Sequence, residues 1–228
     1  ISISSPTAIT ETRLVNGVSS NVQIGAEYTI TITGINLDAN EAKLEIVAGA
    51  IEDQSGNQSA ANEILLYSRL KSASTESDDT SPFLGGPTSI QRQNIESVEF
   101  VSGISGSTDD GVQQVWDVSA LGDESILAWT KQTSAPYTVY IGSEGAMLAN
   151  QNSSRLFSYI GYSNVCSATE TIKNLEILDT STVTDMSYMF QYCGYNAMTT
   201  LDLGSNFDTS KVTTMKSMFI NTGFRKLT

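Results

Sequence analysis

Short alternations of apolar and polar residues dominate the first third of the chain. In residues 28–33 and 44–48, every second side chain is apolar and the residues between them are mostly threonine or glutamate. A period of two places alternate side chains on one face of a β-strand, so each stretch is expected to bury one face. Further strands are expected at 9–15 and 64–67, and turns are expected at 16–17 and at 34. The pattern predicts an antiparallel β-sandwich over residues 1–70.

The next stretch, residues 71–93, has no sustained period of either kind. It is rich in Ser, Thr and Asp and contains Pro82, Gly85, Gly86 and Pro87. This composition is typical of a linker or long loop.

Regular patterns return at residue 94. Strands are expected at 95–100, 115–118 and 137–141, and together they predict a β-rich domain over 94–175. Trp116 and Trp129 are predicted to anchor its core, because large aromatic side chains are usually buried. The alternative is that a flat indole ring lines a sugar site.

A segment of twelve residues occurs twice near the end of the chain. Residues 179–190 read Asp-Thr-Ser-Thr-Val-Thr-Asp-Met-Ser-Tyr-Met-Phe, and residues 208–219 read Asp-Thr-Ser-Lys-Val-Thr-Thr-Met-Lys-Ser-Met-Phe. The offset is 29 residues, and eight of the twelve positions are identical. A period of this length predicts a solenoid, in which each unit buries its apolar face only by stacking on its neighbours.

Within one unit, the apolar residues of 183–190 are spaced i, i+3, i+6 and i+7, which predicts one face of a short helix. The apolar residues of 198–203 alternate and predict a short strand. The predicted repeat core comprises Val183, Met186, Met189, Phe190, Leu201, Leu203, Val212, Met215, Met218 and Phe219. The pattern stops within a unit at Leu227 and Thr228, so further coils are expected to follow.

Residues 178–190 resemble the leading segment of the BspA-like leucine-rich-repeat surface proteins, also described as mycoplasma-type lipoprotein repeats. The resemblance implies an α/β leucine-rich-repeat solenoid over 176–228, incomplete at its C-terminus. It also implies a β-rich capping domain over 94–175, in which residues 154–157 form a degenerate repeat. Caps cover the apolar core that an open solenoid end exposes.

A second resemblance concerns residues 49–57, which are similar to the late strand and turn of bacterial immunoglobulin-like repeats. It implies an immunoglobulin-like module over 1–70, and the strand that begins at Ile1 leaves open whether this module is complete. The expected fold is therefore mainly β with short helices: an immunoglobulin-like β-sandwich, a β-rich cap and a leucine-rich-repeat solenoid.

Composition restricts the chemistry of the chain. Its net charge of −13 and the lack of a basic stripe argue against nucleic acid as a partner. Histidine is absent, which removes the common general bases and catalytic zinc sites. Asp53 and Asn57 could act as calcium ligands, but such a site needs six or more oxygen ligands, whereas an Asx turn needs only these two residues. The sequence predicts no catalytic residue, cofactor or metal site, and no apolar run long enough to insert into a membrane.

Cys166 and Cys193 leave two alternatives open. An even pair in an extracellular protein permits a disulfide. In the resembled family, however, a cysteine three residues after Met-Phe is a buried ladder residue, a position that Cys193 fits and Cys166 does not.

These observations support three hypotheses about function. The first is a fragment of a bacterial cell-surface or secreted protein that presents a solenoid for adhesion, with a protein or glycan on another surface as its partner. The second is a structural subunit of a surface filament or phage particle, with neighbouring subunits as partners. The third is the non-catalytic targeting region of a larger secreted hydrolase.

Overall fold

The computed structural model describes residues 2–3, 7–15, 18–27, 30–31, 37–46, 48, 58, 61–196 and 200–228. The chain divides into two compact units, Ile1–Asn36 and Leu37–Thr228. Strands predominate in the described residues, and the helical segments there are short 3-10 turns. The mainly β fold class predicted from the sequence is therefore confirmed.

The described residues of the first unit form the strands β1 (Ser2–Ile3), β2 (Thr7–Val15), β3 (Val18–Glu27) and β4 (Ile30–Thr31). β2 and β3 form an antiparallel hairpin whose register runs from Thr7 opposite Glu27 to Val15 opposite Val18. β1 pairs with β4, also antiparallel. The strand predicted at 9–15 lies within β2.

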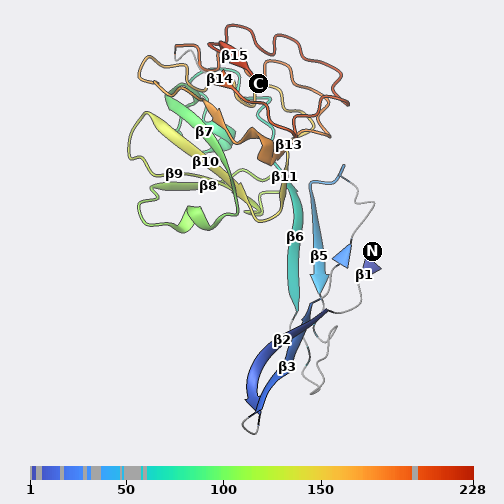
Figure 1. Ribbon diagram of the computed structural model, residues 1–228. Helices are drawn as coiled ribbons and strands as arrows, with labels where there is room; N and C mark the ends of the chain where they lie inside the picture. The colour runs from blue at the N-terminus through green and yellow to red at the C-terminus, as the bar shows by residue number, and fades with distance from the viewer. Residues whose placement is uncertain are drawn as a thin grey trace. The chain divides into compact units, whose positions relative to one another are not determined.

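In the second unit, β5 (Glu41–Ile46) and β6 (Asn62–Arg69) form a hairpin that joins a four-stranded sheet in the order β13-β11-β6-β5 (Figure 1). β6 pairs in parallel with β11 (Ala146–Leu148), which pairs in parallel with β13 (Leu178–Asp179). The predicted domain boundary at residue 70 is therefore wrong. The strand expected at residues 64–67 lies within β6, but its second partner, β11, lies far later in the sequence and leaves no local signal.

A five-stranded sheet forms the centre of the second unit, in the order β12-β7-β10-β9-β8. Its strands are β7 (Ile95–Ser102), β8 (Gln114–Asp117), β9 (Ile126–Thr130), β10 (Tyr137–Ser143) and β12 (Ile172–Lys173). The central pair β7 and β10 is parallel, whereas β9 is antiparallel to both of its neighbours. Ile95, Val98 and Phe100 of β7 and Val139 and Ile141 of β10 are fully buried and contribute to the core.

The remaining elements are short. They comprise β14 (Thr200–Leu201), β15 (Lys226–Leu227) and the 3-10 turns η1 (Phe83–Gly85), η2 (Arg92–Asn94), η3 (Ser105–Thr108) and η4 (Leu175–Ile177). β14 and β15 pair in parallel. The sequence pattern predicted that the strand of the last repeat would lie beyond Thr228. In the structure, Lys226 and Leu227 form that strand and pair with Thr200 and Leu201.

The linker predicted at 71–93 is wrong. Phe83, Leu84 and Ile90 are fully buried in the main core, and Arg92 is fully buried as well. Their irregular spacing follows no helical or strand period, because the segment crosses the core as turns and 3-10 helices. The Ser, Gly and Pro residues between them form those turns.

Candidate functional site

Three segments of the second unit lie one above the next in parallel register. We name them the first coil (residues 153–159), the second coil (residues 186–192) and the third coil (residues 215–221). Backbone N–H groups of each coil donate to carbonyl groups of the next: Phe157 to Met189 at 2.8 Å, and Phe190 to Met218 at 3.0 Å. The repeat seen in the sequence thus corresponds to repeated backbone hydrogen bonding.

The ladder has four rungs between each pair of coils. From the first coil, the N–H groups of residues 153, 155, 157 and 159 donate to the carbonyls of 185, 187, 189 and 191. From the second coil, those of 186, 188, 190 and 192 donate to the carbonyls of 214, 216, 218 and 220. The donors of these four rungs point in one direction along the stack, whereas the flanking N–H groups of Thr184, Gly194, Thr213 and Gly223 donate in the opposite direction.

The motif Asp-Thr-Ser has a structural reason. The carboxylates of Asp179 and Asp208 each accept the N–H group of the serine two residues later, at 2.7 Å. This arrangement is an Asx turn, in which a side chain replaces a backbone acceptor and reverses the chain. Each repeat of the sequence thus opens with a turn that leads into its coil.

The helix predicted at residues 183–190 is wrong. Each coil contains two left-handed residues four positions apart, with φ between 53° and 63°: Arg155, Tyr159, Tyr188, Tyr192, Ser217 and Asn221. An α-helix requires negative φ at every residue. The coils instead contain β-turns closed by hydrogen bonds between residues i+3 and i, such as the one from the Met189 N–H group to the Met186 carbonyl at 3.2 Å. These turns place every third residue inward, which reproduces the spacing that suggested a helix.

A column of phenylalanine rings runs through the stack. The ring centroids of Phe157 and Phe190 lie 5.3 Å apart at an interplanar angle of 20°, and those of Phe190 and Phe219 lie 5.3 Å apart at 1°. Phe190 is fully buried, whereas Phe219 is 38% exposed because no described residue covers its outer face. Parallel stacking of identical residues thus aligns the three coils.

The other predicted core residues differ in burial between repeats. The predicted core residues between positions 183 and 190 are fully buried, and Met218 of the third coil is nearly fully buried. Met215, which corresponds to buried Met186, is 44% exposed. The structure buries Val183, Met186, Met189, Phe190, Leu201 and Met218, half-buries Leu203 and Val212, and exposes Met215 and Phe219.

Four tyrosines form an aromatic patch beside this column. We name Tyr159, Tyr162, Tyr192 and Tyr195 the tyrosine patch. Tyr159 and Tyr192 are stacked, with centroids 5.0 Å apart, and Tyr162 meets both rings edge-on. Tyr195 is 48% exposed and packs against Tyr162 at 5.6 Å. Because the rings touch one another, they form a surface rather than a cage around a cation.

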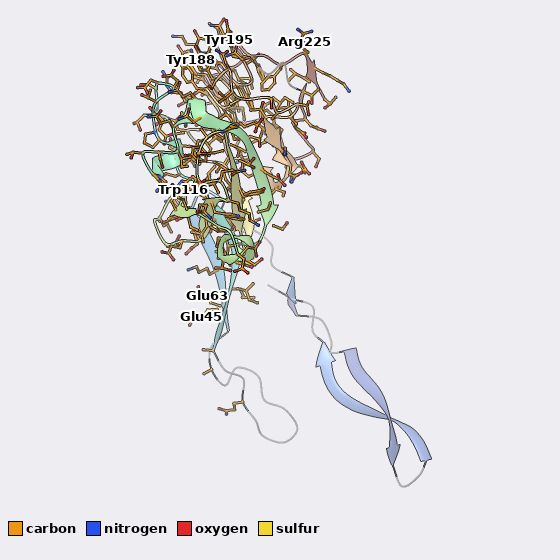
Figure 2. The ribbon with its side chains drawn as sticks, turned by 90° about the vertical axis from the view of Figure 1, so that its left-hand side faces the viewer. Glu45, Glu63, Trp116, Tyr188, Tyr195 and Arg225 are labelled. Atoms are coloured by element: carbon orange, nitrogen blue, oxygen red, sulfur yellow. The ribbon has the colours of Figure 1, made fainter. Side chains whose placement is uncertain are left out.

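A mixed column of cations and one aromatic ring lies on the same coils. The guanidinium of Arg155 lies 4.7 Å from the ring centroid of Tyr188, and the ammonium of Lys216 lies 5.9 Å from it. Figure 2 shows Tyr188 and Tyr195 at the same end of the second unit. Residues 153–228 hold 6 of the chain's 12 basic residues and 6 of its 25 acidic residues. The coil region is therefore neutral, and the net charge of −13 belongs to the rest of the chain.

The comparisons with known proteins concern this same region. Residues 161–226 match the family described as "Mycoplasma protein of unknown function, DUF285". The matched segment contains the second and third coils and agrees with the mycoplasma-type repeat expected there. No curated protein and no solved structure matches the chain.

Sequence reasoning did not identify the tyrosine patch, although a signal existed. Tyr159 and Tyr192 are separated by 33 residues, the same interval that separates the stacked Phe157 and Phe190. Aligning the first coil with the matched segment residue by residue would have placed the two tyrosines in one column.

Cys166 and Cys193 are both buried free thiols, so the disulfide alternative is not realised. Cys193 follows the second coil, where its N–H group donates to the Phe190 carbonyl at 3.0 Å. Cys166 packs at the start of β7, with its Sγ 3.7 Å from the Ile95 carbonyl oxygen. Burial raises the pKa of Cys166 to about 11 and also raises the pKa of Cys193. Both thiols are therefore protonated and weakly nucleophilic at neutral pH.

The two tryptophans are buried, as predicted for core anchors: Trp116 is 9% exposed and Trp129 is 2% exposed. Trp129 stacks on Tyr140 with centroids 5.8 Å apart. A cavity of about 280 Å³ adjoins Trp129, and the ion pair of Lys131 and Asp109 (3.1 Å) lies at its rim. With Trp129 stacked and buried, little of its ring is available for a sugar.

Within the described part of the chain, no group of three or more His, Cys, Asp or Glu side chains is placed to hold a metal ion. Asp53 and Asn57 lie outside the described residues. No helix in the described ranges is long and apolar enough to cross a membrane.

Proposed function

We propose that the chain is a non-catalytic recognition segment of a bacterial cell-surface or secreted protein, of the BspA-like leucine-rich-repeat type. Its stacked coils present the tyrosine patch for adhesion to a protein or glycan on another surface. The observation that carries this proposal is the cluster of four partly exposed tyrosines on a rigid, repeated backbone ladder.

Several physical properties of the patch support recognition. Tyrosine combines a large apolar ring with a hydroxyl group that donates and accepts hydrogen bonds, and it is enriched at binding interfaces. Stacking between the rings restricts their rotamers before binding, which lowers the entropy lost when a partner is bound. The neutral coil region can also approach an acidic surface, which the rest of the chain would repel.

The test is binding of the full chain to arrays of glycans and of extracellular matrix proteins. Tyr195→Ala removes the most exposed ring of the patch and is expected to weaken binding at least tenfold. Leu121→Ala is the matched control, because Leu121 is 54% exposed and lies outside the patch. Equal binding by both variants, or no binding to any arrayed partner, would refute the proposal.

A structural subunit is the second candidate, and a specific observation favours it. Met215, Phe219 and Ile220 of the third coil are 44%, 38% and 43% exposed. Exposed apolar patches often mark contacts between subunits. Sedimentation of the full chain across a range of concentrations distinguishes the candidates, since a subunit should form ordered oligomers without any added partner.

A further inference from the structure

The outward face of the five-stranded sheet carries a row of side chains from neighbouring strands. In the register of the sheet, Tyr140 of β10 lies between Trp129 of β9 and Glu99 of β7. Residues directly opposite one another on neighbouring strands point to the same face of a sheet, so these three side chains share one face. Val139 and Ile141 flank Tyr140 in β10 and are fully buried in the core, so the row lies on the side away from the core.

A short turn covers part of this face and leaves a cavity beside it. The 3-10 turn η3 packs on the indole of Trp129, and a Cβ atom at Gly106 would come within 2.8 Å of that ring. The cavity of about 280 Å³ is lined by residues of η3 and of the sheet. Tyr140 lines it, is partly exposed and stacks on Trp129 with centroids 5.8 Å apart. The tyrosine is therefore the aromatic ring that the cavity offers, and the buried Trp129 restricts its orientation.

Polar groups of the cavity lining provide both donors and acceptors. The Nζ atom of Lys131 lies 3.1 Å from the carboxylate of Asp109, so the pair is neutral as a whole. The hydroxyl groups of Ser102 and Ser105 and the indole N–H group of Trp129 have no hydrogen-bond partner in the described part of the chain. One cavity thus combines an aromatic ring, an ion pair and polar groups that can bond to a ligand.

This combination restricts the class of ligand. An aromatic ring packs against C–H groups, whereas an ammonium, a carboxylate and hydroxyls bind hydroxyl groups. A pyranose ring has both an apolar C–H face and a rim of hydroxyl groups. A free ion would have to separate Lys131 from Asp109, and a purely apolar ligand would leave both without water or a new partner. The volume is at the lower end for small-molecule sites, so it suits a single sugar ring.

We propose that the cavity beside Tyr140 binds one neutral hexopyranose unit of a glycan. The C–H face of the sugar would stack on the Tyr140 ring, and its hydroxyl groups would bond to Lys131, Asp109 and the serine hydroxyls. The site is separate from the tyrosine patch, because its residues belong to β7, β9, β10, η3 and the residues next to them, not to the coils. It does not rest on the proposed function, and either can fail without the other.

The test is saturation-transfer NMR of the full chain with methyl β-glucoside, methyl β-galactoside and methyl α-mannoside. At least one is expected to bind with a dissociation constant of roughly 1–10 mM, as suits a ligand of about a dozen non-hydrogen atoms. Tyr140→Ala should weaken binding by about tenfold or more, whereas Tyr140→Phe keeps the ring and should stay within about threefold of the wild type. Lys131→Ala changes an exposed side chain and is the second variant in case Tyr140→Ala impairs folding; it should weaken binding by about threefold or more.

Tyr195→Ala distinguishes this site from the tyrosine patch, because it removes an exposed ring there and should leave sugar binding unchanged. Binding that persists in both Tyr140→Ala and Lys131→Ala would overturn the proposal, as would loss of binding in Tyr195→Ala alone. No saturation transfer to any of the three sugars at about 50 mM, well above the expected constant, would also overturn it. So would binding of N-acetylneuraminic acid without any of the three, because the site would then select an anion.

Discussion

Arg92 should be one of the most sensitive positions in the protein. Its side chain is fully buried, and its guanidinium contacts three carbonyls of the first coil as well as Glu76. Arg92→Met keeps much of the side-chain volume but removes the charge and every donor. It leaves the partly buried Glu76 carboxylate without its cationic partner and three carbonyls of the first coil without their donor.

The magnitude follows from the groups left behind. Removing one member of a buried ion pair costs about 3–5 kcal/mol, because the other charge remains buried and unpaired. In the variant, Glu76 still accepts hydrogen bonds from the N–H groups of Leu84 and Gly85, each at 3.1 Å, so the loss should stay within this range. We therefore expect Arg92→Met to lower the free energy of unfolding of the second unit by about 4 kcal/mol, roughly a thousandfold in the equilibrium constant.

Urea unfolding followed by tryptophan fluorescence measures this change, since Trp116 and Trp129 are both buried in the same unit. The control is Lys131→Met, which breaks the exposed ion pair with Asp109 and should cost less than about 1 kcal/mol. The double variant Arg92→Met/Glu76→Leu should recover part of the loss, because no unpaired charge remains. Equal, small losses for Arg92→Met and the control would refute the reasoning.

Three further predictions concern burial and charge. Phe190→Ala should lower the free energy of unfolding by about 3–5 kcal/mol, against about 1–2 kcal/mol for the half-covered Phe219→Ala; equal melting shifts would contradict the stacking. The two buried cysteines should not react with a thiol reagent in the native chain, and both should react after unfolding without reductant. Burial, followed by a hydrogen bond with Asp123, raises the pKa of Glu41 above its ordinary 4.5. The folded state then loses stability as pH rises through that raised pKa, so Glu41→Gln should raise the melting temperature at pH 7 but not at pH 4.

The part of the fold that the sequence predicted best is the repeat. Identical residues at a fixed interval must occupy equivalent positions, so the stacking of Phe190 on Phe219 followed from the alignment alone. The local conformation did not follow. A spacing of three suits both a helix and a series of β-turns, and the left-handed Tyr188 and Tyr192 decide between them. Tyrosine is rarely left-handed, so its identity gave no indication.

Long-range pairing accounts for the other errors. Residues 71–93 have the composition of a linker, yet Phe83 and Arg92 are buried by residues that are distant in sequence. The strand predicted at residues 64–67 lies within β6, but its pairing with β11 was not predicted, because parallel pairing has no short-range signature. The tyrosine patch was missed for a related reason: its members come from two coils and become neighbours only when the coils stack.

The side chains at the left-handed positions lie on the surface of the stack, whereas the buried phenylalanines hold the coils together. A non-glycine residue in this conformation costs about 1–2 kcal/mol, and glycine would avoid that cost. The chain nevertheless carries arginine and tyrosine there, in two outer columns flanking the buried phenylalanines. The residues in these columns can therefore be substituted without changing the packing of the interior. Glycine or asparagine is the reference residue, because both tolerate the left-handed conformation. The stack is in this sense a scaffold on which new specificities can be engineered, one column at a time.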